Sequence, residues 1–591
     1  VPVTPGGRDG GLVWVGNERP TGAGPNPPIP GVPVLTIPEV QSYQAYAIVD
    51  PAENPVGDIR YRNFLVPVGD EYVAPSALVG HSLFCAGHAW TSFGDLVVFG
   101  GTDFETGGEH LGGYLTYVFN PRLECYWPET QIEFYPSPAS GIPAPTGSDY
   151  VGLWLRAPDL VIPRWYPTAT ATHRILRGSA TTAFKERIVC LGGVEAVTPP
   201  PDDRAERTYE AYVVQGEATS QALNLEPDVA ASPTGILDPA IATTITTFPD
   251  QVWNGPGWNQ TTGTFTYPLG EYPRTFSLWT GELLVAGYEP RSSKVDHETP
   301  GYWSLTNPQP GSSPPAYSSN WQDDRHDGSA VLFPNLGNNT DIVMRMGGAT
   351  SFLGATTDTV ESIAAGSGGT WASAPPLPAR GSLPDGGRTF TNAVLLPTGA
   401  VLLLGGQWQN GSGATQPIYV PELFENGQWH EMPSNPTASR RTYHSTAVLL
   451  PDGRVFLGGG DDRDSDYEIF SPPYLNEPSE RPVGLAWQAP APLLNPDMGA
   501  HELHYGQPYK IQCDPLPLGL SITKAVLMAP CSTTHHSDMH QRYVELKATI
   551  DQGHIVTFAS PNNDREAPRG LYMLFLVSQS SVSEAMWVVL R

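Results

Sequence analysis

The sequence predicts an all-β protein, a seven-bladed β-propeller followed by a C-terminal immunoglobulin-like β-sandwich. The composition is rich in turn formers, because the 591 residues include 62 Gly and 62 Pro and only 16% of them are charged. An apolar strand that ends in glycine recurs six times between residues 80 and 460. The last stretch of about 110 residues lacks this recurrence and holds short alternating strands, which favours a separate small domain.

Charge and hydropathy argue against several partners. The formal net charge of −28 disfavours nucleic acid and anionic membranes, because no basic surface would displace phosphate counterions. No uninterrupted apolar run approaches the roughly 20 residues that span a bilayer. The chain begins Val1-Pro2, with neither a Met nor a charged and apolar leader, so we expect a mature secreted chain, whether extracellular, on the cell surface or periplasmic. We expect a monomer.

The repeat occupies most of the chain. Residues 1–40 are rich in Pro and Gly and are expected to form an extended arm, and residues 41–475 the propeller with insertions. The last four glycine ends are spaced by 60, 58 and 53 residues, and a period near 50 with paired glycines after an apolar strand is the kelch pattern. Six units suggest six or seven blades, the seventh closed by the N-terminal segment. The six strand ends are Val97–Gly101, Val189–Gly193, Leu284–Gly287, Met344–Gly348, Leu402–Gly406 and Val455–Gly459.

The repeat stops in a Pro-rich linker between Ser471 and Pro482. Residues 483–591 are then expected to form the sandwich, because their apolar stretches are short and evenly spaced. The expected strands lie at 509–512, 525–528, 543–546, 555–558 and 572–577.

Two copies of the repeat differ at one informative place. Arg388-Thr389-Phe390 and Arg441-Thr442-Tyr443 are offset by 53 residues, and where the first copy continues with Thr391 the second has His444. Packing needs only an aromatic ring, whereas a phenol beside an imidazole is typical of a pair of metal ligands. We therefore expect Tyr443 to occupy the place of Phe390.

The distance to the strand-ending glycine predicts that other residues occupy positions equivalent to that of Phe390. Phe390, Tyr443 and Cys85 each lie 15 residues before the glycine that ends their unit, and Arg164-Trp165-Tyr166 repeats the Arg-x-aromatic signature. Equivalent places on the innermost strands of a propeller ring its axis. Cys85, Tyr166 and the Tyr443-His444 pair should therefore meet at one mouth of the axis.

Each of these residues also has an ordinary structural interpretation. A lone cysteine is usually a small core residue, an aromatic can be part of the repeat's packing, and a histidine can complete a turn. The stretch Cys531–Arg542 adds three histidines, His535, His536 and His540, which alone would be expected in a solvated loop. The convergence of several such residues on one axis favours a site.

Together these residues resemble the copper radical oxidases, typified by galactose oxidase and glyoxal oxidase. The resemblance covers roughly residues 80–591, and the Arg-Trp-Tyr-Pro motif looks closer to the glyoxal oxidase branch. It rests on four motifs in the same order along the chain: Phe84–Gly87, Arg164–Pro167, Arg441–Ser445 with Leu450–Phe456, and Thr534-His535 ahead of Gln541-Arg542.

The resemblance implies a copper site with one ion per chain. Cys85 would be joined through its sulfur to the ring of Tyr166, giving a protein-derived radical cofactor. Tyr166, His444 and His535 would be equatorial ligands, and Tyr443 the axial phenolate. His536 and His540 would lie behind the ligands or at the surface. Imidazole and phenolate donors suit Cu(II) in a tetragonal array.

The implied reaction is oxidation of a primary alcohol to an aldehyde, or of an aldehyde to an acid, with reduction of dioxygen to hydrogen peroxide. Tyr443 would take the hydroxyl proton and the Tyr166 radical a hydrogen from the substrate carbon. Substrate-lining positions by resemblance are Arg274, Gln407 and Trp408. The tryptophan that shields the thioether in galactose oxidase is missing after Gly192-Gly193, and Trp90, Trp165 or Trp408 could replace it.

The remaining cysteines could form disulfides. Removing Cys85 from the five cysteines leaves four; Cys513 and Cys531 could pair within the sandwich, and Cys125 with Cys190.

The main alternative function is that of a non-catalytic secreted propeller that binds glycan or protein, with Cys85 unlinked and no copper. A hydrolase is disfavoured because no nucleophile motif is present.

Overall fold

A computed structural model gives the structure of the chain. It describes residues 325–591 with gaps at 334–340, 366–370, 381–382, 435–438, 461–466 and 496–498. Before residue 325 it describes shorter stretches, chiefly 85–103, 162–172, 184–197 and 271–286, together with the strands named below. The predicted all-β class is confirmed, because the helices in this described part are two 3-10 turns, η5 (Pro473–Leu475) and η6 (Pro478–Glu480). None of its helices is long and apolar enough to cross a membrane.

Six antiparallel sheets follow one another between residues 87 and 470, and each begins with an inner strand. The first three are β7 (Gly87–Trp90), β8 (Leu96–Phe99), β11 (Thr116–Asn120) and β13 (Leu153–Ala157); β14 (Thr168–Ala171), β16 (Phe184–Leu191), β19 (Tyr209–Val214) and β20 (Gly235–Leu237), with β15 (Ile175–Leu176) beside β16; and β23 (Thr275–Ser277), β24 (Leu283–Val285), β25 (Ser293–Asp296) and β26 (Tyr302–Leu305). The next three are β27 (Ser329–Phe333), β28 (Ile342–Met346), β29 (Val360–Ala364) and β30 (Ala372–Ala374); β31 (Asn392–Leu395), β32 (Val401–Leu404), β35 (Glu422–Glu425) and β36 (Gln428–Glu431); and β37 (Ser445–Leu449), β38 (Val455–Gly459) and β39 (Tyr467–Phe470).

The recurring glycines have a steric cause. Gly405, which follows β32, has a left-handed backbone (φ +66°), and a Cβ on it would overlap the carbonyl oxygen of Arg441 in the next sheet. Gly347 stands in the same relation to Arg388. Only glycine allows the two backbones to approach this closely. The strand ends that are visible in the sequence therefore mark the contacts between consecutive sheets.

The arginine of the Arg-x-aromatic signature bonds to a glycine carbonyl and to a glutamate of its own sheet. The Arg388 Nε donates to the Gly405 carbonyl oxygen at 2.8 Å, and its Nη1 lies 2.9 Å from a Glu422 carboxylate oxygen. Arg164 repeats the pattern with the Gly192 carbonyl and Glu210. Removing one partner of such a buried ion pair typically costs about 3–5 kcal/mol, because the remaining charge is left uncompensated.

The N-terminal part adds another four-stranded sheet. It is formed by β1 (Leu12–Glu18), β2 (Tyr43–Val49), β3 (Tyr61–Asn63) and β12 (Phe134–Tyr135). The expected arm over residues 1–40 thus contains a sheet strand, and the rest of it lies outside the described residues. Other short strands are β4 (Val66–Val68), β5 (Glu71–Val73), β6 (His81–Ser82), β9 (Thr102–Asp103), β10 (Leu111–Gly112), β17 (Val194–Val197), β18 (Asp203–Ala205), β21 (Trp258–Asn259), β22 (Thr264–Phe265), β33 (Gln407–Gln409) and β34 (Thr415–Pro417).

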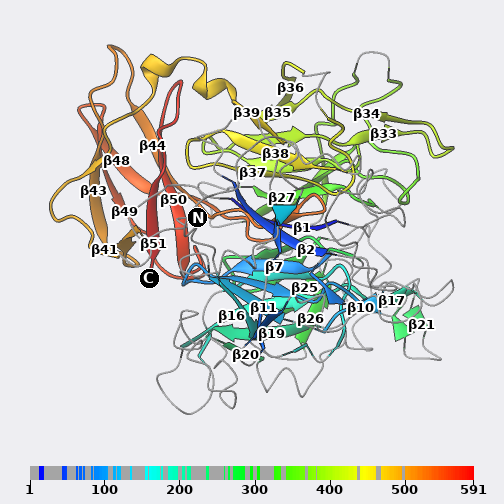
Figure 1. The fold of residues 1–591 in the computed structure, drawn as a ribbon. Coiled ribbons are helices and arrows are strands. Elements are labelled where there is room, and N and C mark those ends of the chain that lie inside the picture. The colour runs from blue at the N-terminus through cyan, green and yellow to red at the C-terminus, as the bar shows by residue number, and fades with distance from the viewer. Residues whose placement is uncertain are drawn as a thin grey trace.

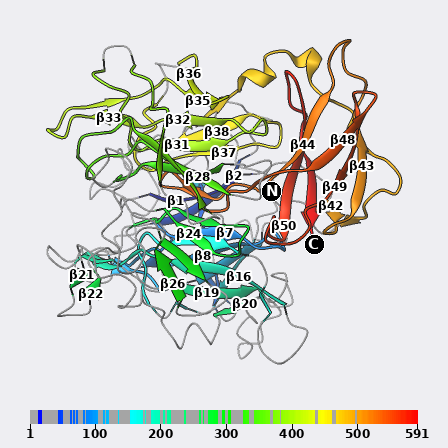
Figure 2. The same ribbon diagram turned by 180° about the vertical axis from the view of Figure 1, so that it is seen from behind.

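The C-terminal domain is made of two sheets and a small hairpin. These strands, drawn orange to red, stand beside the sheets of the first domain in both views (Figures 1 and 2). One sheet has β40 (Ala486–Trp487), β43 (Pro508–Gln512), β49 (Ile555–Ala559) and β48 (Lys547–Asp551). The other has β41 (Leu494–Asn495), β42 (Ala500–Leu503), β51 (Met586–Leu590), β50 (Gly570–Ser578), β44 (Ile522–Met528) and β47 (Tyr543–Glu545). The hairpin is β45 (Thr533–Thr534) with β46 (Ser537–Asp538).

The larger of these sheets is buried on both faces. Along β44, Ala525 and Leu527 pack in the core between the two C-terminal sheets. Val526 and Met528 point the other way, into a core that they share with Val401 of β32. Because side chains alternate across a strand, both faces of this strand are apolar. The C-terminal domain is therefore fastened to the first domain by a continuous hydrophobic core.

Candidate metal centre

Each inner strand is preceded by a residue in a left-handed backbone conformation, which side chains other than glycine rarely adopt. Neighbouring members of this set are joined through their backbones. The Tyr166 N–H donates to the Cys85 carbonyl at 3.0 Å and the Tyr272 N–H to the Tyr166 carbonyl at 2.7 Å. The set therefore brings together residues from separate sheets. Its members are Cys85 (φ 65°), Tyr166 (60°), Tyr272 (43°), Asp327 (52°), Phe390 (55°) and His444 (66°).

The expected equivalence of Tyr443 and Phe390 is wrong. Asn392 pairs with Leu404 in one sheet, whereas Ser445 pairs with Gly459 in the next. From these strands onward the offset is therefore 54 residues, because one residue is inserted ahead of β37. His444, rather than Tyr443, takes the left-handed position of Phe390. Tyr443 is an additional side chain beside it.

The C-terminal hairpin supplies a further histidine. His535 (φ 45°) and His536 (φ 65°) are the two loop residues between β45 and β46. Two-residue turns with both residues left-handed normally carry Asn-Gly, and a strained residue costs on the order of 1–3 kcal/mol. Contacts with the first domain support the turn: Arg274 Nη2 donates to the His535 carbonyl at 3.3 Å and Thr446 Oγ1 to the Thr533 carbonyl at 3.1 Å.

These segments bring five chemically active side chains into one cluster. The phenol oxygens of Tyr166 and Tyr443 lie 2.8 Å apart. The Cys85 Sγ lies 3.9 Å from the His535 Nε2. The ligand atoms of Cys85, His444 and His535 all fall within 4.8 Å of one another. Cys85, Tyr166 and His535 are buried, while Tyr443 and His444 are partly exposed, so solvent reaches the cluster on their side.

Burial shifts the pKa values of two members of the cluster. Burial, followed by positive charge on His444, His536 and Arg274, lowers the pKa of His535 well below its ordinary value, so the imidazole is neutral and has a lone pair for a metal. Its Nδ1 lies 2.9 Å from Thr534 Oγ1, which leaves Nε2 directed at the cluster. Burial and then the Cys85 thiol and Tyr443 hydroxyl raise the pKa of Tyr166 well above its ordinary value.

The donor set fits copper. Two imidazoles and two phenol oxygens converge, and nitrogen and oxygen donors of this kind suit Cu(II) in tetragonal geometry. The residues placed to hold an ion are Tyr166, Tyr443, His444 and His535. Cys85 lies beside them and is available for another role.

Comparison with known proteins points in the same direction. The family model "Glyoxal oxidase N-terminus" matches residues 328–477, and "Galactose oxidase-like, Early set domain" matches residues 495–590. The chain is a relative of the galactose and glyoxal oxidases. Galactose oxidase of Gibberella zeae is 31% identical over 202 residues, 33% of this chain and 28% of that protein. Aldehyde oxidase GLOX1 of Arabidopsis thaliana is 28% identical over 232 residues, 34% of this chain and 35% of that protein. The matched part thus spans about a third of the length of these relatives.

A solved structure shares the whole fold. It is described as "Novel fungal alcohol oxidase with catalytic diversity among the AA5 family, in complex with copper". It is 19% identical, has a TM-score of 0.58, and the match covers 99% of this chain and 95% of that chain. The shared fold therefore extends over nearly the whole chain.

The structure distinguishes among the three tryptophans that the sequence offered as a cover for Tyr166. The Trp165 ring stacks on Tyr166 with centroids 4.1 Å apart and planes inclined by 22°. Trp90 instead donates its Nε1–H to the Cys531 carbonyl at 3.0 Å, and Trp408 donates to Asp385 Oδ1 at 3.1 Å. Among the three candidates from the sequence, Trp165 is the one for which the structure shows this stacking.

The expected substrate-lining residues lie in different settings. Arg274 is 2% exposed, and its guanidinium donates to the backbone carbonyls of Tyr272, Gly328 and His535. This favours a positioning role for Arg274. Gln407 is half-buried on β33, with its Nε2 3.3 Å from Gln409 Oε1. Trp408 beside it is also half-buried.

Two aromatic residues near the cluster were missed. Tyr272 stacks on His535 with centroids 4.5 Å apart, and its signal was the same 15-residue spacing to a strand-ending glycine, Gly287. Phe352 is 45% exposed and stands edge-on to Tyr443 with centroids 5.0 Å apart. Phe352 lies in the connection from β28 to β29, where no motif marks it.

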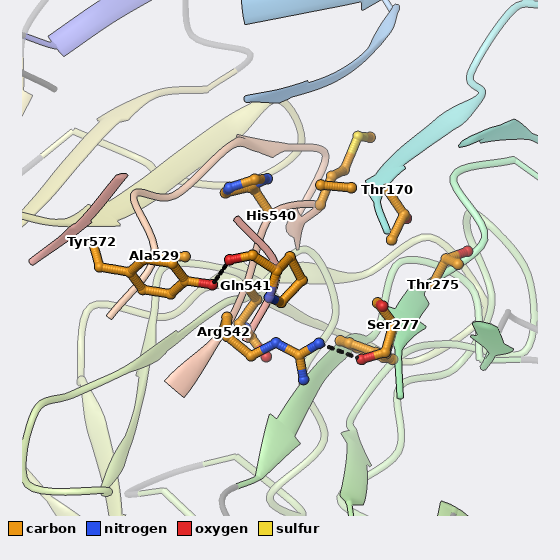
Figure 3. A pocket seen from close by; sticks show the side chains of 12 residues that line it. Thr170, Thr275, Ser277, Ala529, His540, Gln541, Arg542 and Tyr572 are labelled. Carbon is orange, nitrogen blue, oxygen red and sulfur yellow. Dashed lines mark hydrogen bonds between the residues drawn. The ribbon is translucent and has the colours of Figure 1, made fainter. Parts of the chain in front are cut away.

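The other two histidines of the hairpin region have neighbours outside the group of donors. His536 Nε2 lies 3.4 Å from the Thr442 carbonyl, and burial lowers its pKa to about 3. His540 lines a cavity of about 20 Å³ together with Thr170, Ser277 and Arg542 (Figure 3). None of the five clustered residues is among those that line this cavity.

The expected disulfide between Cys513 and Cys531 is not formed. Both cysteines are unpaired. Cys513 belongs to the core between the two C-terminal sheets, whereas Cys531 packs against the core shared with the first domain. The two faces of one sheet separate them. Cys190 is likewise unpaired in a buried strand, and its suggested partner Cys125 lies outside the described residues.

Proposed function

We propose that this chain is a secreted mononuclear copper radical oxidase. It would oxidise a primary alcohol to an aldehyde, or an aldehyde to an acid, and reduce dioxygen to hydrogen peroxide. The observation that carries the proposal is the cluster itself: two phenol oxygens 2.8 Å apart, with a thiol and two imidazoles around them. The family matches and the copper-containing structure of the same fold support it.

Four side chains would hold the ion, namely Tyr166, Tyr443, His444 and His535. Bound copper would supply a one-electron acceptor and a coordination position for the substrate. Tyr443 has the partly exposed phenol of the cluster, and it would take the proton of the substrate hydroxyl. Tyr166 would supply the second oxidising equivalent and take hydrogen from the substrate carbon.

Cys85 gives Tyr166 the means to hold that equivalent. A thioether between the Cys85 sulfur and the Tyr166 ring would make the phenol easier to oxidise. The stacked Trp165 ring covers one face of Tyr166, which would exclude water from the radical. Both features involve side chains already in contact with Tyr166 in the structure.

The finer features of the fold belong to the same proposal. The sheet of β1, β2, β3 and β12 would be the seventh blade, in addition to the six between residues 87 and 470. The two C-terminal sheets would form an immunoglobulin-like sandwich whose hairpin delivers His535. We further propose that the protein acts as a monomer on small-molecule substrates.

Peroxide release tests this function directly. Copper-loaded protein is assayed with a panel of primary alcohols, glyoxal-type aldehydes and sugars, beside Tyr166→Phe as the variant that cannot form the radical. The proposal predicts peroxide with at least one substrate class from the wild type and none from Tyr166→Phe. Equal signals from both proteins, or a wild type that binds no copper and releases no peroxide, would instead favour a binding propeller.

The two histidines of the hairpin turn offer a second arm. His535→Ala should lose most copper affinity, because it removes a buried donor of the cluster. His536→Ala should keep copper, because its ring is directed at the Thr442 carbonyl. Retention of copper by His535→Ala with loss by His536→Ala would contradict the ligand assignment.

A further inference from the structure

Tyr272 has no role in the reaction described above, yet its ring contacts two members of the cluster, Tyr166 and His535. It is 1% exposed and occupies one of the left-handed positions, with its N–H donating to the Tyr166 carbonyl at 2.7 Å. A left-handed tyrosine is uncommon, and the surrounding structure must compensate for its cost.

The side chain of Tyr272 touches three parts of the site at once. Its ring stacks on His535 with centroids 4.5 Å apart and planes inclined by 28°. It also contacts Tyr166, with ring centroids 5.0 Å apart. Its hydroxyl donates to the carbonyl of Ala86, next to Cys85, at 3.3 Å. One residue therefore connects the radical tyrosine, the hairpin histidine and the backbone of the cysteine.

Another member of the left-handed set shows which part of Tyr272 the fold needs. Phe390 occupies the corresponding position in another sheet and packs on Tyr443 and His536 with a ring that has no hydroxyl. Packing at these positions is thus satisfied by an aromatic ring alone. What is particular to Tyr272 is that its ring lies flat on the imidazole of a proposed ligand.

The Tyr272 ring fixes the tilt of the His535 imidazole, which the hydrogen bond of His535 does not fix. The contact between Thr534 Oγ1 and Nδ1 holds one edge of the imidazole but allows the ring to tilt about that edge. A neighbouring ring face prevents this tilt, because an apolar surface at van der Waals distance excludes other orientations. The direction of the Nε2 lone pair then follows from both contacts together.

We propose that Tyr272 is a positioning residue that sets the plane of the His535 imidazole for metal binding. This inference rests on the proposed copper site. Tyr272 touches no substrate and takes no proton; it acts through His535. Groups behind a metal ligand that orient it typically change metal affinity by about 10–100-fold when they are removed.

The test compares three variants of the full-length protein. Tyr272→Leu removes the ring, Tyr272→Phe keeps it, and Tyr212→Leu removes another fully buried tyrosine from the same hydrophobic core. The readouts are the copper dissociation constant from chelator competition, the nitrogen hyperfine pattern of Cu(II) by electron paramagnetic resonance, and urea unfolding of the metal-free proteins.

We expect Tyr272→Leu to weaken copper binding by about 10–100-fold and to alter the nitrogen hyperfine pattern. Tyr272→Phe should restore the wild-type pattern, and Tyr212→Leu should lower stability without changing it. A wild-type pattern and affinity in Tyr272→Leu would overturn the inference, as would equal changes in Tyr212→Leu. A wild type without a Cu(II) signal would instead overturn the proposed function, and the inference with it.

Discussion

The hydroxyl of Thr534 offers a selective perturbation of the proposed copper site. It lies 2.9 Å from the Nδ1 of His535, and Thr534→Val keeps the shape of the side chain while removing this contact. Loss of a partner behind a histidine ligand weakens metal binding by about 10–100-fold, which corresponds to about 1.4–2.7 kcal/mol. The metal-free protein should also lose about 1 kcal/mol of unfolding free energy, because a partly buried hydrogen bond is removed.

The neighbouring threonine provides the matched control. The buried Thr533 hydroxyl has no hydrogen-bond partner among the residues that the structure describes. Thr533→Val makes the same change on the same strand, and both copper affinity and stability should stay at the wild-type level or rise slightly. The assay is competition with a chelator of known copper affinity, beside urea unfolding of the metal-free proteins. Equal copper affinities for the two variants would refute the reasoning.

Two other predictions concern stability. Gly405→Ala should cost more than about 3 kcal/mol of unfolding free energy, measured in urea, because its Cβ would overlap the Arg441 carbonyl. Gly427 is also left-handed, but no atom lies within 4 Å of a Cβ built on it, so Gly427→Ala should cost only about 1 kcal/mol. Similar losses for both variants would contradict the steric account. Burial, followed by the charge of Arg542, lowers the pKa of His540 from 6.5 to about 3, so its contribution to stability is full above pH 6.5 and is lost as the pH falls toward 3. Between pH 6.5 and 5 the metal-free protein should lose about 2 kcal/mol of unfolding free energy through His540, at about 1.4 kcal/mol per pH unit. The His540→Asn variant should lose correspondingly less over that interval. If its stability falls with pH as steeply as that of the wild type, His540 is not the cause of the pH dependence.

The fold could be predicted from the sequence because its contacts restrict residue type. The backbones of consecutive sheets approach so closely at Gly347 and Gly405 that only glycine fits. The arginine that follows in the next sheet supplies the facing carbonyl, so the two signals recur together. The 15-residue spacing predicted that Cys85 and Phe390 hold equivalent places, and the Arg-Trp-Tyr motif predicted the same for Tyr166. All three have left-handed backbones just ahead of an inner strand.

Features set by side-chain packing could not be predicted in this way, and one insertion was overlooked. One residue is inserted ahead of β37, and the sequence marks it, because the runs Leu395–Gly399 and Leu449–Gly453 are 54 residues apart while Arg388 and Arg441 are 53 apart. The 15-residue spacing to Gly458 concealed it, because the run Gly458–Gly460 offers two pairs of glycines. The choice of Trp165 depends on a ring stacking on its own neighbour, which no spacing encodes. The pairing of Cys513 with Cys531 fails because sequence proximity does not tell which face of a sheet a side chain occupies.

The cross-link between Cys85 and Tyr166 is the most direct test of the central claim. Copper-loaded protein is digested with trypsin, and the peptides that contain the two residues are identified by mass spectrometry, with Cys85→Ser as the control. The account predicts a single joined species, lighter than the sum of the two peptides by two hydrogens, in the wild type and its absence from Cys85→Ser. Separate, unmodified peptides from copper-loaded protein that releases peroxide would contradict it.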